Sequence, residues 1–155
     1  MSQDQLKDLT EAQILKCLSP PVERHVIALN TQGVPWDQIG HLLALTPSAA
    51  LSLKGPGWNR HLWLEVKAEV YSFLCEDSEP YSDLRSEWNT LTEKSSALAI
   101  ASLSGAIGSE LGMAGGVVAP MVIWAIAVAV RIGKEAACRA FRPPAVESPQ
   151  GSPTA

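Results

Sequence analysis

The side chains that could perform chemistry are few and lie far apart along this chain. The three histidines, His25, His41 and His61, are not paired with one another or with a cysteine at the spacing of metal ligands. The nucleotide-binding patterns GxxxxGK and GxGxxG do not occur either. We therefore expect a protein that is not an enzyme and that uses no cofactor, metal ion or small-molecule substrate.

Carboxylates could act as general acids or bases at two places. Glu76, Asp77 and Glu79 lie at an expected turn, where negative charge stabilises the N-terminus of the following helix. General acid or base catalysis would need a shaped pocket, which this pattern does not predict. Glu110 is the single charge in a long apolar stretch. Inside a membrane it would be a functional residue, whereas at the tip of a hairpin it would be solvated, and we expect the second.

The three cysteines are Cys17, Cys75 and Cys138, and none belongs to a CxxC pair. Their odd number, together with a polar N-terminus that does not resemble a secretory signal, predicts reduced thiols in the cytoplasm. Cys75 and Cys138 could meet in space, but we expect two small buried thiols.

The charge and composition of the chain change near Lys94. The whole chain of 155 residues has 12 basic and 16 acidic side chains, so any contact with nucleic acid or an anionic membrane must be local. Residues 1–94 have a net charge of −5, and residues 95–155 have a net charge of +1. We expect four parts: a helix-turn-helix-like domain (1–57), a pair of amphipathic helices (58–94), an apolar, glycine-rich helical hairpin (95–142) and a proline-rich disordered tail (143–155).

Apolar residues recur at helical spacing, and no stretch shows the alternation of a strand, so the sequence predicts an all-α protein. A capping box at Thr10 and Gln13 and the Ser19-Pro-Pro sequence mark two helix starts. A long amphipathic helix is expected from about Asn59 to Cys75, and another follows Pro80. Their apolar faces consist of Trp63, Val66, Val70, Phe73 and Leu74 in the first, and of Tyr81, Leu84, Trp88 and Leu91 in the second.

The stretch Gly33 to Leu53, GVPWDQIGHLLALTPSAALSL, resembles the helix-turn-helix segment of bacterial regulators and sigma-like domains. In this pattern Trp36 and Ile39 pack the first helix, and Gly40 lets the helices approach closely. The resemblance implies that the second helix contacts DNA, but that helix lacks the arginines common at its exposed positions. The segment could instead be a packing or protein-binding unit. The candidate DNA-binding residues are Ser48, Ser52, Lys54 and Arg60.

The apolar stretch from Ser95 to Val130 is long enough to cross a membrane. Its glycines and Pro120, which suits a first helical turn, predict a hairpin with arms at about 95–109 and 119–139. Small residues four apart allow close helix packing. The residues assigned to this packing and to the hairpin are Gly105, Gly108, Gly112, Gly116 and Glu110.

Three environments remain open for the hairpin: a membrane, the buried centre of a soluble bundle wrapped by the helices around Trp63 and Trp88, and an interface between copies of the chain. The segments FLCED around Cys75 and GKEAAC ending at Cys138 resemble parts of small uncharacterised bacterial proteins that end in a similar hairpin. This resemblance implies no activity.

Two functions follow from these features. The first is a non-enzymatic bacterial regulatory or defence-type accessory protein, in which the helix-turn-helix contacts DNA or a protein partner and the hairpin docks to a membrane or a partner. The second is a membrane-perturbing effector of the pore-forming type, in which the N-terminal helices shield the hairpin and sense a trigger. For either we expect a protein partner or a homo-oligomer, and a cytoplasmic or inner-membrane location with both ends of the hairpin in the cytoplasm.

Overall fold

The computed structural model describes residues 4–45, 59–77 and 79–144. These residues form nine α-helices and no strand, so the prediction of an all-α protein is confirmed. The second helix of the expected helix-turn-helix, after residue 45, and most of the expected tail lie outside the described residues. The helices are α1 (Asp4–Lys7), α2 (Glu11–Leu15), α3 (Pro20–Thr31), α4 (Trp36–Leu43), α6 (Asn59–Cys75), α7 (Ser82–Lys94), α8 (Ser96–Leu111), α9 (Gly115–Ile132) and α10 (Lys134–Phe141).

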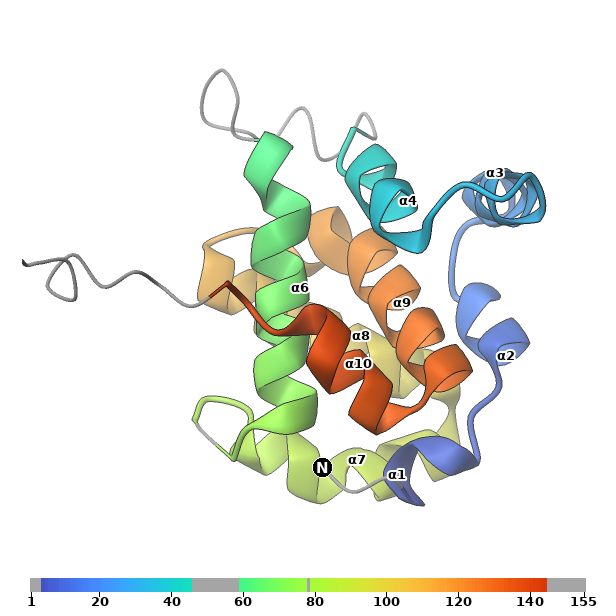
Figure 1. Ribbon diagram of the computed structural model, residues 1–155. Helices are drawn as coiled ribbons and strands as arrows, with labels where there is room; N and C mark the ends of the chain where they lie inside the picture. The colour runs from blue at the N-terminus through green and yellow to red at the C-terminus, as the bar shows by residue number, and fades with distance from the viewer. Residues whose placement is uncertain (1–3, 46–58, 78, 145–155) are drawn as a thin grey trace, which may run out of the picture.

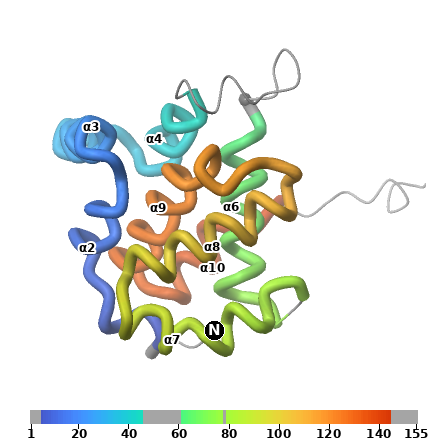
Figure 2. Tube along the Cα trace, turned by 180° about the vertical axis from the view of Figure 1, so that it is seen from behind, coloured from blue at the N-terminus to red at the C-terminus, as the bar shows by residue number. Residues whose placement is uncertain are grey.

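Helix α9 runs through the centre of the molecule (Figure 1). Helix α8 packs along it as the other arm of the hairpin, and α2, α4, α6 and α10 contact α9 on its remaining sides. Seen from behind, α8 lies in front of α9, while α3 stands at the edge beside α4 (Figure 2). Every residue from Met121 to Ala129 is buried. We call α2, α4, α6 and α10 the sheath, because together with α8 they enclose α9.

Local signals in the sequence set several helix ends. Thr10 and Gln13 form the predicted capping box at the start of α2. Gly33, after α3, has a φ of 84°, and Gly112, after α8, has a φ of 72°, which glycine adopts without strain. Ser95 caps α8 through a hydrogen bond from the Leu98 amide to its hydroxyl oxygen.

The second arm of the hairpin differs from the prediction. It begins at Gly115 rather than near residue 119, so Pro120 lies inside the helix instead of in its first turn. The first arm ends at Gly112. The connection after it is short, so the second arm begins earlier in the sequence than predicted. Gly116, whose carbonyl would accept the amide hydrogen that Pro120 lacks, is exposed, so water can replace that bond. The arm then breaks at Gly133, which has a φ of 92°, and α10 follows as a separate helix.

The amphipathic helices use the predicted faces. Trp63, Val66, Val70, Phe73 and Leu74 of α6 are all fully buried. Aromatic rings of α7 and its preceding turn pack on Phe73, with centroid distances of 5.1 Å to Trp88 and 6.1 Å to Tyr81. Arg85 of α7 donates hydrogen bonds to the carbonyl oxygens of Ser72 and Phe73 near the end of α6.

Gly40 allows α4 to approach α6. A Cβ atom at this position would lie 2.1 Å from Cε2 of Trp63, whose ring is fully buried. Gly40 is therefore a position of close packing, and the neighbour that it accommodates is Trp63 of α6, whereas the second helix of the expected helix-turn-helix lies outside the described residues.

We expect Gly40→Ala to lower the free energy of unfolding by about 1–3 kcal/mol, because overpacking a rigid core forces side chains and backbone apart. Urea unfolding measures this change. Gly105→Ala is the matched control, since a Cβ there has no atom within 4 Å. This variant should be stabilised by about 0.5–1 kcal/mol through its higher helix propensity. Equal effects of the two substitutions would contradict the close contact at Gly40.

Candidate functional site

The turn of the hairpin depends on Gly108 and Gly112, two of the glycines assigned to helix packing, and on Gly115. A Cβ on Gly108 would lie 2.5 Å from the carbonyl oxygen of Met113, and a Cβ on Gly115 would lie 3.0 Å from Cα of Gly105. Gly112 ends α8 with its positive φ. These glycines therefore serve the tight connection between the arms. Gly116 has open space around it and does not take part in this packing.

The outer face of α8 is exposed and carries no charge until the end of the helix. It consists of small or apolar residues, and Glu110 follows at the tip, exposed as predicted. Leu98 on this face is 42% exposed. The uncharged exposed residues are Ala97, Leu98, Ala101, Gly105 and Ser109.

Helix α9 is the one described helix that is long and apolar enough to cross a membrane, with a mean hydropathy of 2.0. Polar contacts nevertheless join it to the sheath. The indole Nε1 of Trp124 donates a hydrogen bond of 2.8 Å to the backbone oxygen of Trp36 in α4. Arg131 forms an ion pair with Glu11 of α2 and lies over the ring of Trp124. Both contacts connect the hairpin to the N-terminal helices.

A groove leads from the surface to the first half of α9. It has a volume of about 230 Å³ and lies between α9 and the segment that joins α2 to α3. The sheath is therefore open at this point. The groove is lined by Cys17, Leu18, Ser19, Val22, Gly116, Ala119, Pro120 and Ile123.

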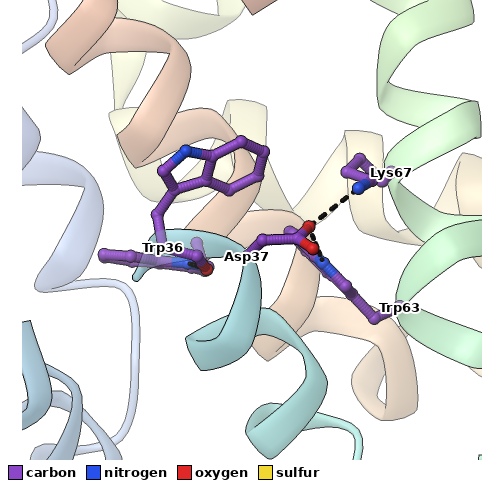
Figure 3. Close-up of polar contacts among 5 residues, drawn as sticks. Trp36, Asp37, Trp63 and Lys67 are labelled. Carbon is purple, nitrogen blue, oxygen red and sulfur yellow. Dashed lines mark hydrogen bonds and ion pairs between the residues drawn. The ribbon is translucent and has the colours of Figure 1, made fainter. Parts of the chain in front are cut away.

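A polar cluster joins α4 to α6 beside the hairpin. Oδ1 of Asp37 accepts a hydrogen bond of 2.8 Å from Nε1 of Trp63 and one of 2.7 Å from Nζ of Lys67 (Figure 3). The ammonium group of Lys67 also lies 5.5 Å from the ring centroid of Trp36 and 5.8 Å from that of Trp63. Burial alone would raise the pKa of Asp37, but the hydrogen bonds from Lys67 and Trp63 and the charge of Lys67 outweigh it and lower the pKa. This arrangement keeps Asp37 ionised and holds α4 on α6.

The lowered pKa of Asp37 predicts a dependence of stability on pH. The ionised carboxylate of Asp37 contributes fully to the free energy of unfolding above the usual carboxyl pKa of about 3.9. This contribution is lost as the pH falls through the lower pKa that Asp37 has in the folded protein. Urea midpoints should therefore show Asp37→Asn less stable than wild type at neutral pH, with a smaller difference at about pH 3. The effect should be modest, since 46% of the Asp37 side chain is exposed and solvent screens the pair. An equal difference in stability between wild type and Asp37→Asn at both pH values would contradict a stabilising role of the ionised Asp37.

A disulfide joins Cys75, at the end of α6, to Cys138 in α10, with a Cα–Cα distance of 5.9 Å. The prediction of reduced thiols is therefore wrong for these two cysteines. The sequence placed both on helices, but 63 residues separate them, and only the packing of α10 on α6 brings them together. Cys17 is free and half-buried, and burial raises the pKa of its thiol.

The candidate DNA-binding residues lie mostly outside the part of the chain that the structure describes. Ser48, Ser52 and Lys54 lie outside the described residues, and Arg60 belongs to the first turn of α6.

Within the described part of the chain, no group of three histidine, cysteine or acidic side chains could hold a metal ion. Comparisons of the chain with protein-family models, curated proteins and solved structures gave no match.

Proposed function

We propose that this chain is a non-enzymatic protein that keeps α9, one arm of an apolar hairpin, inside a helical sheath and acts by delivering the hairpin to a membrane. The observation that carries the proposal is the position of α9. It is the described helix suited to cross a bilayer, and its residues from Met121 to Ala129 are buried among five other helices. Its 18 residues span about 27 Å, close to the hydrocarbon thickness of about 30 Å.

The outer face of α8 supports a membrane role over that of an ordinary core hairpin. A surface helix of a soluble protein normally carries charged residues on its exposed side. Ala101 and Gly105 occupy this side of α8 instead, and the helix has no charge before Glu110. Once the sheath moves away, α8 before Glu110 and α9 before Arg131 present uncharged surface to lipid.

The residues after α9 fit the membrane surface. Arg131 lies at the end of α9, and Lys134, Arg139 and Arg142 follow it. Such a basic flank is attracted by anionic headgroups and stays on the side from which the hairpin enters. The two ends of the hairpin would then remain on one side of the membrane.

This proposal favours the effector among the two functions derived from the sequence. The N-terminal helices act as the shield, since Glu11 and Trp36 contact α9 directly. A regulatory or defence-type role that uses the same hairpin is compatible with it. DNA binding and a protein partner or homo-oligomer stay predictions.

Flotation with vesicles of phosphatidylcholine and phosphatidylglycerol in equal parts tests the proposal. Gly40→Ala loosens the contact of α4 with α6 without changing the hairpin. A loss of one or two kcal/mol should raise the open population, and with it the vesicle-bound protein, about five- to thirtyfold.

A second substitution shows whether the hairpin is the part that binds. Ala101 and Ala28 are both exposed, so glutamate at either should leave the folded protein stable. Within a bilayer a charge at Ala101 costs about 2.5–3.5 kcal/mol. Ala101→Glu in the Gly40→Ala background should therefore abolish vesicle binding, whereas Ala28→Glu, outside the hairpin, should not. Equal binding of both double variants would contradict insertion of the hairpin.

A further inference from the structure

The disulfide crosslinks α10, the last helix of the sheath, to the end of α6. Helix α10 contacts both α6 and α9 (Figure 1). We propose that Cys75–Cys138 is a reducible clamp, and that its reduction by a dithiol releases α10 and opens the sheath around α9. This inference rests on the proposed function, for which it names the trigger.

Helix α10 is suited to leave the body of the protein once the clamp is open. It has eight residues, which is too short for a helix to be stable alone in water. Its fully buried side chains are Ala137 and Phe141, and Phe141 packs on Trp36 at a centroid distance of 5.4 Å. Gly133 separates α10 from α9 with a φ of 92°, so the break between the two helices is already present.

Cys75 and Cys138 are both only half-buried, so we expect a small reductant to reach the disulfide from solvent. A thiolate of the reductant attacks one sulfur, the S–S bond breaks, and the other cysteine leaves as a thiolate and takes up a proton. The second thiol of the reductant then attacks, as a thiolate, the reductant's sulfur in the mixed disulfide, and the first cysteine leaves as a thiolate and takes up a proton. The protein gains two thiols and the dithiol becomes a cyclic disulfide, so two electrons are transferred.

Release of α10 has a direct consequence for the hairpin. Helix α10 and the N-terminal helices contact α9 together, and Phe141 connects α10 to Trp36, the residue whose carbonyl oxygen accepts the hydrogen bond from Trp124. Loss of α10 therefore exposes part of α9 to solvent and removes the packing of Phe141 on Trp36. The remaining helices keep their own buried contacts, so the body of the protein should stay folded.

Hydrogen exchange of the full-length protein, with and without dithiothreitol, tests the clamp. The Cys17→Ser background leaves Cys75–Cys138 as the responding group. Reduction should speed exchange of the α10 amides at least about tenfold while α7 keeps its protection. The fraction that floats with the equal phosphatidylcholine and phosphatidylglycerol vesicles should rise as well. Cys75→Ser/Cys138→Ser, which cannot be clamped, should behave like the reduced protein in both buffers.

The results separate the clamp from the proposed function. Faster exchange in α10 without vesicle binding would support the clamp and contradict delivery of the hairpin to a membrane. If the cysteines alkylate fully after reduction but the α10 amides exchange no faster, the clamp is overturned. It is also overturned if Cys75 and Cys138 are already free thiols before reduction. Loss of protection throughout the chain on reduction would also overturn it, because the disulfide would then be a general structural crosslink.

Discussion

Replacing Trp124 with alanine should lower the free energy of unfolding by about 3–5 kcal/mol. Its indole is fully buried in the middle of α9, so the substitution leaves a large cavity where the hairpin meets the sheath. It also removes the hydrogen bond to the backbone oxygen of Trp36. Such a loss is a large part of the total of about 5–15 kcal/mol expected for a domain of this kind. Urea unfolding monitored by circular dichroism measures it.

Trp124→Phe is the control for this prediction, because it retains an aromatic ring and removes the Nε1 donor. We expect Trp124→Phe to lower the free energy of unfolding clearly less than Trp124→Ala does. Part of the decrease comes from the lost hydrogen bond, which is worth about 1–3 kcal/mol when a buried partner is left unpaired. Unfolding midpoints of Trp124→Ala close to wild type would show that α9 is not the centre of the fold.

Glutamate in the two arms of the hairpin should have very different effects. Ala127 of α9 is fully buried, whereas Ala101 of α8 is exposed. An unpaired carboxylate at Ala127 should destabilise the protein by more than about 4 kcal/mol, because burying a charge without a partner is among the most costly single substitutions. The same substitution at Ala101 should change stability by no more than about 0.5 kcal/mol.

This comparison distinguishes the sheathed hairpin from a hairpin that always lies in a membrane. In a permanent membrane location Ala101 would also face lipid or another helix, and both glutamates would be disruptive. Soluble expression and a normal unfolding curve for Ala101→Glu, together with insoluble or unfolded Ala127→Glu, would agree with the structure. Similar defects in both variants would contradict it.

Patterns confined to neighbouring residues made much of the fold predictable. The capping box at Thr10 and the apolar face that contains Trp63 depend on spacing within one helix, and a hairpin follows from glycines between two apolar runs. The arm boundaries were less accurate, since Pro120 suits a first turn but is tolerated where its missing hydrogen bond faces water.

The contacts that build the candidate site could not be predicted in this way. Trp124 and Trp36 are 88 residues apart, and Asp37 and Trp63 are 26 apart, so their pairing depends on how whole helices pack. The same is true of the disulfide, since cysteine spacing alone does not give connectivity. Gly40 is an intermediate case. Its need for close packing was visible in the helix pattern, but its neighbour was not.

Photoactivatable phospholipids in the vesicle membrane test most directly whether the hairpin enters lipid. The Gly40→Ala protein, bound to such vesicles and illuminated, can be digested and its lipid-labelled peptides identified by mass spectrometry. Delivery of the hairpin predicts labels within Gly115–Ile132 and their loss when Ala101→Glu is added. Vesicle-bound protein labelled only outside α8 and α9, or no binding by the loosened protein, would contradict the proposed function.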